Sequence, residues 1–311
     1  MNKQEQDILI DLWRWKLLST AALTEMHFSK QQPSSAYNRL WRLRQEGLIS
    51  TMHLSGKKTD RAFLWTLSPR GFKEILPLLD SMKEVGFRSE CVQHDWLVTA
   101  VHLGEWLKGL PVGCEVFTEQ ELRRFHSSQY PNWIPKGDDR RPDGYWRIRK
   151  GHKFGTVALE VELSKKTPTE YRSIATAYDL EESIYRVVWV VKSKTISSTI
   201  EEQRGVGNSS SCFSYILLSD FLEKGWDAKV YLGRDQGFSL RQLLCDSVQT
   251  VHKLVCTRSL LNTAKSPHKS GFFSFRSEIP KSHGRGSSLV SAPSTSLLSN
   301  NPSQGVPTNE K

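Results

Sequence analysis

The first 75 residues show three helical patterns followed by two short strand patterns. Apolar residues recur at helical spacing in residues 3–15, 19–26 and 33–46, and Ser, Pro and Gly stand where these helices would begin or end. Residues 48–52 and 61–66 then read as two strands around a turn containing Ser, Gly and Lys. The predicted order is helix, helix, helix, hairpin.

The third helical pattern has two unlike sides. Its apolar stripe contains Ala36, Tyr37, Leu40 and Leu43, which recur at helical spacing. The other side is polar and basic, and it carries Ser34, Ser35, Asn38, Arg39 and Arg42.

From residue 89 onward, helices and strands are expected to alternate. Residues 185–191 (Tyr-Arg-Val-Val-Trp-Val-Val) are apolar on both faces and follow a helical pattern, which predicts a central strand reached by a parallel crossover. The predicted fold class is therefore α/β, with a mixed sheet in this second part. The expected helices are 89–108, one from 169, 198–204 and one from 240, and the expected strands are 114–117, 144–148, 156–163, 185–191, 212–218 and an edge strand at 228–232.

Composition sets the predicted domain boundaries. After about residue 262 the chain becomes rich in Ser, Pro, Lys and Gly, which is typical of disorder. We predict a first domain at residues 1–75, a connector at 76–88, an α/β domain at 89–262 and a tail at 263–311.

Charge narrows the class of partner. The 311 residues include 43 Lys and Arg against 33 Asp and Glu, a formal net charge of +10, and the sequence pI is near 9.4. This balance favours a polyanion, with nucleic acid as the first expectation and an anionic membrane surface as the second.

Cysteine usage and hydropathy point to a reducing, aqueous compartment. The five cysteines are scattered and form no C-x-x-C pair, so neither a disulfide framework nor a zinc knuckle is expected. No apolar run has the length of a signal sequence or a membrane span. We expect a cytoplasmic protein that does not enter a membrane.

The N-terminal domain resembles a winged helix-turn-helix. The resemblance is carried by Tyr37-x-x-Leu40-x-x-Leu43-x-x-x-Gly47-Leu48-Ile49 and by Leu67-Ser68-Pro69-Arg70-Gly71. It implies that the third helix enters the major groove of double-stranded DNA while the hairpin lies along the backbone. Between residues 29 and 61 there are seven basic residues and two acids, which agrees with such a partner.

The resemblance divides the expected DNA contacts into two kinds. Asn38, Arg39 or Arg42 would read bases, since Asn suits adenine and Arg suits guanine, and Ser34 and Ser35 lie on the same side. Phosphates would be held by the basic residues of the hairpin, which are Lys57, Lys58 and Arg61. A dimerisation or protein-docking module with a solvated basic face stays open as the alternative.

Acidic residues gather on one predicted strand of the second domain. Glu160 and Glu162 alternate with Val161 and Leu163, so the two carboxylates share a face and lie about 7 Å apart. With Asp143 from a neighbouring strand they would form a divalent-cation site, to which Glu119 could contribute. The alternative is a solvated strand face.

The segment before that strand is basic and aromatic. Residues 121–153 hold nine basic residues against four acids, interleaved with two Tyr and two Trp. This mixture suits a phosphate backbone passing over a metal site, although a basic hairpin rim would look the same. His94 and His102 on the preceding helix are eight residues apart, and because zinc prefers closer pairs we expect ordinary packing or polar contacts for them.

The acids also resemble the PD-(D/E)xK nuclease core. Pro142-Asp143 matches its first element and Glu160 its second, but Glu162 stands at the lysine position. If the strand continues that far, Lys166 has the parity to replace that lysine, whereas Lys165 would point away. The resemblance implies catalytic Asp143, Glu160, Glu162 and Lys166, with Mg²⁺ or Mn²⁺ on Asp143, Glu160 and Glu119 if the site is active and no cofactor otherwise.

The whole arrangement resembles the replication-relaxation family of plasmids and other mobile elements. The residues that carry the resemblance are His94, Glu119, Arg141-Pro142-Asp143-Gly144, Glu160-Val161-Glu162 and Tyr178. It implies DNA binding in replication initiation, DNA relaxation or transcriptional control, with a replication or relaxation protein as a further partner. Homodimer formation stays open.

The sequence leaves three candidate functions open. The leading hypothesis is a DNA-binding protein whose nuclease-like domain has lost cleavage or recognises DNA structure. The second is an active Mg²⁺-dependent DNA endonuclease. The third is a partner-docking regulatory protein without a metal site, in which Glu160 and Glu162 pair with Arg147, Arg149 or Lys166.

Overall fold

The computed structural model describes residues 1–53, 63–103, 114–137, 141–150, 153–204 and 212–245. All of these belong to one compact unit, Met1–Thr263. In the described part of the chain, no helix is long and apolar enough to cross a membrane. The predicted turn at 55–60 and the tail at 263–311 lie outside the described residues.

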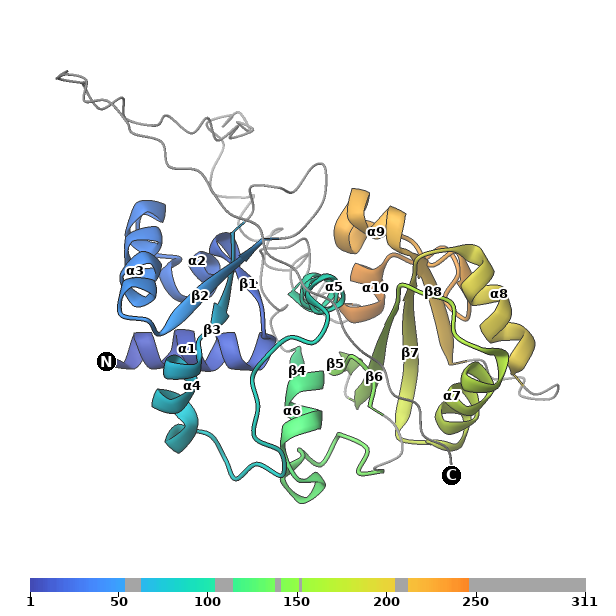
Figure 1. Cartoon of the computed structure of the whole chain (residues 1–311). Coiled ribbons are helices and arrows are strands. Elements are labelled where there is room, and N and C mark those ends of the chain that lie inside the picture. The colour runs from blue at the N-terminus through green and yellow to red at the C-terminus, as the bar shows by residue number, and fades with distance from the viewer. Residues whose placement is uncertain (54–62, 104–113, 138–140, 151–152, 205–211, 246–311) are drawn as a thin grey trace, which may run out of the picture. The chain divides into compact units, whose positions relative to one another are not determined.

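The N-terminal part combines helices with a small antiparallel sheet (Figure 1). The predicted order of three helices and a hairpin is confirmed, and a short strand between the first two helices and a fourth helix add to it. The strand order is β1-β3-β2. The elements are α1 (Lys3–Trp15), β1 (Leu18–Ser19), α2 (Thr20–Phe28), α3 (Pro33–Gln45), β2 (Ile49–His53), β3 (Phe63–Leu67) and α4 (Pro69–Ile75), followed by the 3-10 turn η1 (Leu76–Leu78).

Local sequence signals explain where these helices begin. Asn2 and Glu5 form a reciprocal capping box at α1, while the Ser19 and Ser68 side chains accept backbone N–H groups at the starts of α2 and α4. Pro33 occupies the first position of α3, where its missing N–H has no consequence. The apolar faces then close over one core that contains Leu9, Leu12, Leu40, Leu43 and Trp65.

The second part is built on a six-stranded mixed sheet, as predicted. The strand order is β4-β5-β6-β7-β8-β9, with β6, β7 and β8 parallel and the other pairs antiparallel. Its strands are β4 (Glu115–Thr118), β5 (Gly144–Lys150), β6 (Lys153–Glu162), β7 (Ile184–Val191), β8 (Phe213–Leu217) and β9 (Leu232–Gly233). Its helices are α5 (Val92–Leu103), α6 (Glu119–Arg124), α7 (Pro168–Leu180), α8 (Lys194–Gln203), α9 (Leu218–Lys224) and α10 (Leu240–Cys245), with 3-10 turns η2 (Ser127–Gln129) and η3 (Gly225–Asp227).

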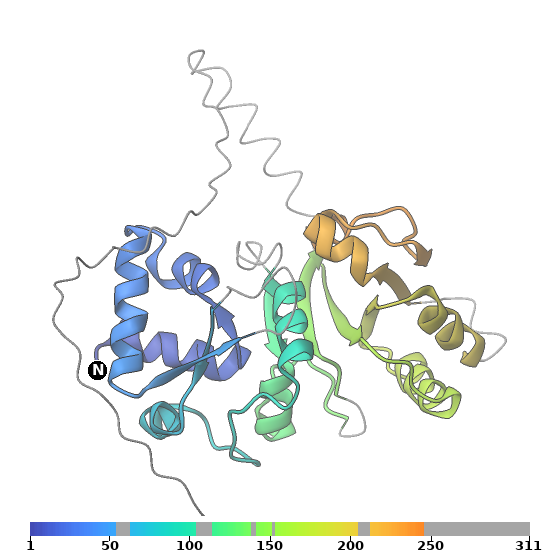
Figure 2. The same ribbon diagram turned by 45° about the horizontal axis from the view of Figure 1, so that its top comes forward.

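Helices cover both faces of this sheet (Figure 2). On one face, Tyr178 of α7 packs edge-on against Phe213 of β8, with ring centroids 6.0 Å apart. On the other, His102 of α5 packs against Trp146 of β5 at 4.9 Å, and the Trp226 indole of η3 donates to the Val101 carbonyl at 2.8 Å. Residues 187–191 of β7 are fully buried as a result, which confirms the predicted central strand and its parallel crossover.

The remaining differences lie in short elements and in the start of α8, which was predicted at residue 198 but begins at Lys194. The edge strand expected at 228–232 is wrong in extent, because β9 pairs with β8 only through Leu232 and Gly233. Helices α6 and α9, of six and seven residues, have too few turns to show a periodic pattern and were not predicted.

Candidate functional site

The side of α3 that faces away from the core is polar at its N-terminal end. Ala36, Leu40 and Leu43 are fully buried, whereas Ser34, Ser35 and Asn38 are exposed. The structure therefore places three of the predicted DNA-binding residues together on an open helix face. Lys57, Lys58 and Arg61 lie outside the described residues.

Arg39 and Arg42 are placed differently from those three residues. Arg39 Nη1 lies 2.6 Å from Glu5 Oε1, and Arg42 Nη2 contacts the same carboxylate oxygen. Burial alone would raise the pKa of Glu5, but the Asn2 backbone hydrogen bond and the two guanidinium groups outweigh it and hold that pKa below its usual range. Both arginines thus brace α3 against α1, and a role for them on DNA stays a prediction.

Aromatic side chains occupy the exposed face beyond Asn38. Tyr37 was predicted to belong to the apolar stripe, but this is wrong, since its side chain is 43% exposed. It stacks on Trp41 with ring centroids 6.1 Å apart and an interplanar angle of 16°. The Arg44 guanidinium lies 4.5 Å from the centre of the Trp41 ring.

The two glutamates of β6 point toward α7. Glu160 is 8% and Glu162 4% exposed, so the alternative of a solvated strand face is wrong. The Tyr178 hydroxyl donates a hydrogen bond to Glu160, and the Lys166 ammonium pairs with Glu162. Each carboxylate is therefore stabilised by a group of the protein itself.

Lys166 reaches Glu162 by a route that strand parity did not foresee. Strand β6 ends at Glu162, so Lys166 approaches from the connection that leads into α7. Its backbone N–H donates to the Tyr171 hydroxyl at 3.0 Å, which fixes that connection. The predicted pairing of Lys166 with the acidic face is confirmed, whereas its catalytic role stays a prediction.

Asp143 closes the end of the β5–β6 ladder. Its backbone N–H donates to the Leu159 carbonyl at 2.9 Å, and its carboxylate accepts the Val161 N–H at 2.6 Å. Strand pairing begins only at the next residue, Gly144, so the Asp143 side chain satisfies a backbone donor that has no strand partner there. His94 Nε2 lies 3.5 Å from the same carboxylate oxygen.

Close packing explains why the Arg-Pro-Asp-Gly motif has a glycine at position 144. Its φ is +147°, and a Cβ at this position would lie 2.4 Å from His102 Nε2. His102 is fully buried, and the same Nε2 donates to the Asp143 carbonyl at 3.1 Å. Burial lowers the pKa of His102 to about 4, so its ring is neutral at physiological pH.

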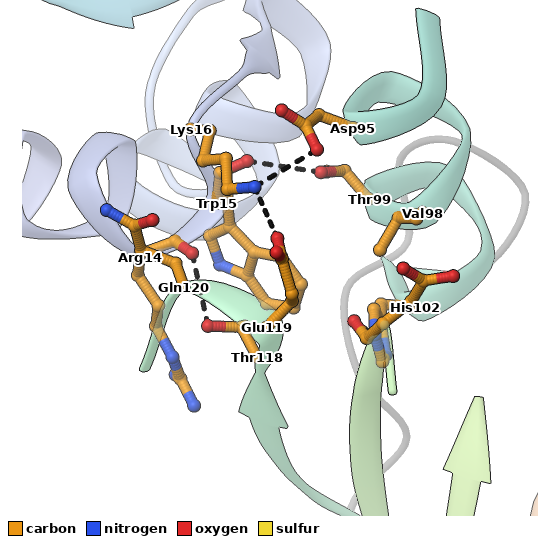
Figure 3. Close-up of a pocket in the computed structure, with 11 residues that line it drawn as sticks. Arg14, Trp15, Lys16, Asp95, Val98, Thr99, His102, Thr118, Glu119 and Gln120 are labelled. Carbon is orange, nitrogen blue, oxygen red and sulfur yellow. Dashed lines mark hydrogen bonds and ion pairs between the residues drawn. The ribbon is translucent and has the colours of Figure 1, made fainter. Parts of the chain in front are cut away.

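Glu119 belongs to a different cluster, centred on Lys16 (Figure 3). The Lys16 ammonium contacts Glu119 and lies 3.1 Å from Asp95 Oδ1. Lys16 is 6% exposed and has φ +62°, an uncommon conformation for a residue with a side chain. Burial would lower the pKa of Lys16, but Glu119 and Asp95 outweigh it and raise that pKa.

His94 connects this cluster to Asp143. Its Nδ1 lies 3.8 Å from Asp95 Oδ1, and its Nε2 faces Asp143. Burial opposes the charged ring, yet the nearby Asp143 and Asp95 carboxylates and a hydrogen bond to the Val161 carbonyl outweigh it and raise the pKa of His94 to about 11. The result is a chain of alternating charges, Glu119, Lys16, Asp95, His94 and Asp143.

A small pocket adjoins the chain of charges. Its volume is about 20 Å³, room for about one water molecule. Its lining includes Trp15, Lys16, Asp95, His102 and Glu119. Sequence reasoning missed Lys16 and Asp95, because they are 79 residues apart and no local spacing relates them.

The predicted cation ligands do not share a centre. Glu160 bonds to Tyr178, Glu119 to Lys16, and Asp143 to the Val161 N–H and His94. Among the residues that the structure describes, no group of three or more His, Cys, Asp or Glu is arranged to hold a metal ion. As placed, these carboxylates do not fit Mg²⁺ or Mn²⁺, and that cofactor stays a prediction.

Comparisons with known proteins add little to this description. No protein-family model and no curated protein matches the chain. The structure shows a likeness to a zinc-responsive MarR family member, ZitR of Lactococcus lactis, at 20% identity and a TM-score of 0.21. The likeness covers 24% of this chain and 47% of that one. A similarity this low supports no conclusion about fold or function, so the replication-relaxation and nuclease-like resemblances stay predictions.

Proposed function

We propose that this protein binds double-stranded DNA in a sequence-specific manner, with residues 1–75 acting as a winged helix-turn-helix. The observation that carries the proposal is α3, which follows α2 closely, has no acidic residue in Pro33–Gln45 and exposes Ser34, Ser35 and Asn38 near its N-terminus. The N-terminal residues of a recognition helix are those that contact base edges in the major groove.

The surroundings of α3 support the same reading. The three-stranded sheet in the order β1-β3-β2 and the hairpin strands β2 and β3 give the module the element order expected for a winged helix. Ion pairs from Arg39 and Arg42 to Glu5 hold the helix on α1, so its exposed face is fixed before any partner binds. The net charge of +10 favours a polyanionic partner.

Binding to the DNA upstream of the protein's own reading frame, or to an origin, tests the proposal. Fluorescence anisotropy with a labelled duplex is expected to show an affinity that falls linearly with salt on logarithmic axes, because phosphate contacts release counterions. An affinity that does not change with salt, or no binding above that of a scrambled duplex, would contradict the proposal. The position of the preferred site then separates replication initiation and relaxation from transcriptional control.

For the α/β part we propose a role other than cleavage. Support comes from Asp143, Glu160 and Glu162, each of which already bonds to a protein group, as described above. The endonuclease alternative is tested by nicking of supercoiled DNA with Mg²⁺. We expect the wild-type protein and the Asp143→Ala variant to nick at the same background rate, whereas Mg²⁺-dependent nicking that Asp143→Ala abolishes would establish the endonuclease.

A further inference from the structure

The exposed aromatic residues of α3 form a ladder with an arginine at its end. Tyr37 is 43% and Trp41 37% exposed, and both belong to the face that also carries Asn38. Tyr37 lies one helical turn before Trp41 and Arg44 one turn after it, so both the phenol and the guanidinium lie near the indole ring. We call Tyr37, Trp41 and Arg44 the aromatic ladder.

Arg44 differs from Arg39 and Arg42, the other arginines of α3, in its ion pairs. Arg39 and Arg42 share the Glu5 carboxylate, which neutralises part of their charge. Within the described residues, no carboxylate lies within ion-pair distance of Arg44, and its guanidinium lies over the Trp41 ring. Among the residues that the structure describes, no acidic side chain therefore compensates the positive charge of Arg44.

Stacking also fixes the direction of that charge. A guanidinium over an indole is attracted by the ring electrons and loses part of its rotamer freedom. Its planar fork then matches the oxygen pair of a phosphate. Because Arg44 lies in the last turn of α3, while base edges are read from the N-terminal turns, its place is on the backbone rather than on a base.

The stacking also selects the form of DNA. Binding of unpaired bases requires aromatic faces that are free to stack. The Trp41 ring stacks on Tyr37 and lies 4.5 Å from the Arg44 guanidinium, so neighbouring side chains of the helix already engage it. This arrangement suits a duplex with a continuous phosphate backbone.

We infer that the aromatic ladder is a phosphate clamp for duplex DNA, in which Trp41 positions Arg44 against the backbone and so sets the orientation of α3. The inference rests on the proposed DNA-binding function. Arg44 contributes affinity without sequence preference, whereas Asn38 contributes the preference.

The test starts from a duplex library with a randomised 14-bp centre, from which full-length wild-type protein enriches a preferred duplex. Anisotropy then measures the binding of the wild type and of Arg44→Ala, Trp41→Ala and Asn38→Ala to that duplex, to a scrambled duplex and to its single strand. Arg88→Ala is the matched control, because Arg88 is also an exposed arginine over an aromatic ring, Phe87, at 5.8 Å. Thermal melting confirms that each variant is folded.

Arg44→Ala and Trp41→Ala are expected to weaken both duplexes equally, by about five- to tenfold, and Arg44→Ala to reduce the salt slope by about one. Asn38→Ala is expected to keep the slope and to lose the preference between the two duplexes, and Arg88→Ala to match the wild type. Unchanged duplex binding by Arg44→Ala, a loss confined to the preferred duplex, or tight binding of the single strand that depends on Trp41 would overturn the clamp while the proposed function stands. If the wild type enriches no duplex, the proposed function itself fails.

Discussion

Lys16 shows how a single residue can depend on its surroundings. Its ammonium is buried against the carboxylates of Asp95 and Glu119, and its backbone holds φ at +62°. Such a conformation costs of order 1 to 3 kcal/mol unless neighbouring contacts enforce it. The two ion pairs therefore need to be intact for the turn after α1 to keep its shape.

Replacement of Lys16 by Met tests this dependence. The variant removes the Lys16 ammonium from the buried Asp95 and the partly exposed Glu119, so we expect the free energy of unfolding to fall by about 3 to 5 kcal/mol. Urea denaturation measures this loss of unfolding free energy. Lys3→Met is the matched control, because the Lys3–Asp7 pair is 2.7 Å long but lies on the surface, and its loss should cost less than about 1 kcal/mol. Equal effects of the two variants would contradict the role of Lys16.

The pKa values of the two histidines of α5 should be shifted in opposite directions. The pKa of His94 is raised to about 11, so its stabilising effect is complete below the unfolded-state pKa near 6.5 and is lost as the pH rises toward 11. The pKa of His102 is lowered to about 4, so its contribution is present above pH 6.5 and is lost as the pH falls toward 4. NMR of the imidazole protons should find His94 charged at pH 8 and His102 neutral at pH 6. A shared pKa near 6.5 would contradict both environments.

At the scale of elements, α1 joins the two parts of the protein. Near its start, Glu5 holds two arginines of α3. At its end, the Trp13 indole donates to the Gly86 carbonyl, Arg14 pairs with Glu121, and Lys16 pairs with Asp95 and Glu119. One helix thus connects the proposed recognition helix to the α/β part through ion pairs at both ends.

Glu5→Gln should separate the bracing of α3 from its contact with DNA. Loss of the carboxylate leaves Arg39 and Arg42 without their shared partner, so we expect a stability loss of about 1 to 3 kcal/mol. The released arginines are then free to meet phosphates, and the salt slope for a scrambled duplex should steepen by about one to two. Urea denaturation and anisotropy measure the two effects. Glu46→Gln is the control, because Glu46 pairs with Arg42 on the surface at 3.4 Å. A slope that matches the wild type would show that these arginines do not reach the DNA.

The contrast between local patterns and long-range contacts explains what the sequence could and could not predict. The long helices and the central strand β7 follow from periodicity and local caps, which need only neighbouring residues. The Lys16–Asp95 pair and the bracing of Arg39 by Glu5 depend on residues brought together by folding across 79 and 34 positions. Tyr37 was misplaced because helical spacing puts it beside Ala36 and Leu40, although the core does not extend as far as its ring.

For the whole molecule, the acids of the α/β part act as internal partners of folded elements. Glu162 ties β6 to the start of α7, Glu160 ties it to Tyr178 later in α7, and Asp143 closes the β5–β6 ladder. Each carboxylate would have to leave a protein hydrogen bond or ion pair before it could bind a cation. The free energy of that exchange opposes metal binding.

Metal independence of DNA binding is the corresponding prediction for the full chain. We expect the duplex affinity of the wild-type protein to be the same, within about twofold, in EDTA and in Mg²⁺ at matched ionic strength, because counterion release depends on salt rather than on a bound metal. Isothermal titration with Mn²⁺ should give no saturable heat for the wild type. The Lys166→Met variant is the sharper case, since it removes the cation that pairs with Glu162, and it too should give no saturable heat. The prediction would be contradicted if the wild type bound Mn²⁺ saturably and Asp143→Asn or Glu160→Gln removed that binding. Such a result would show that these acids form a metal site rather than acting only as internal partners.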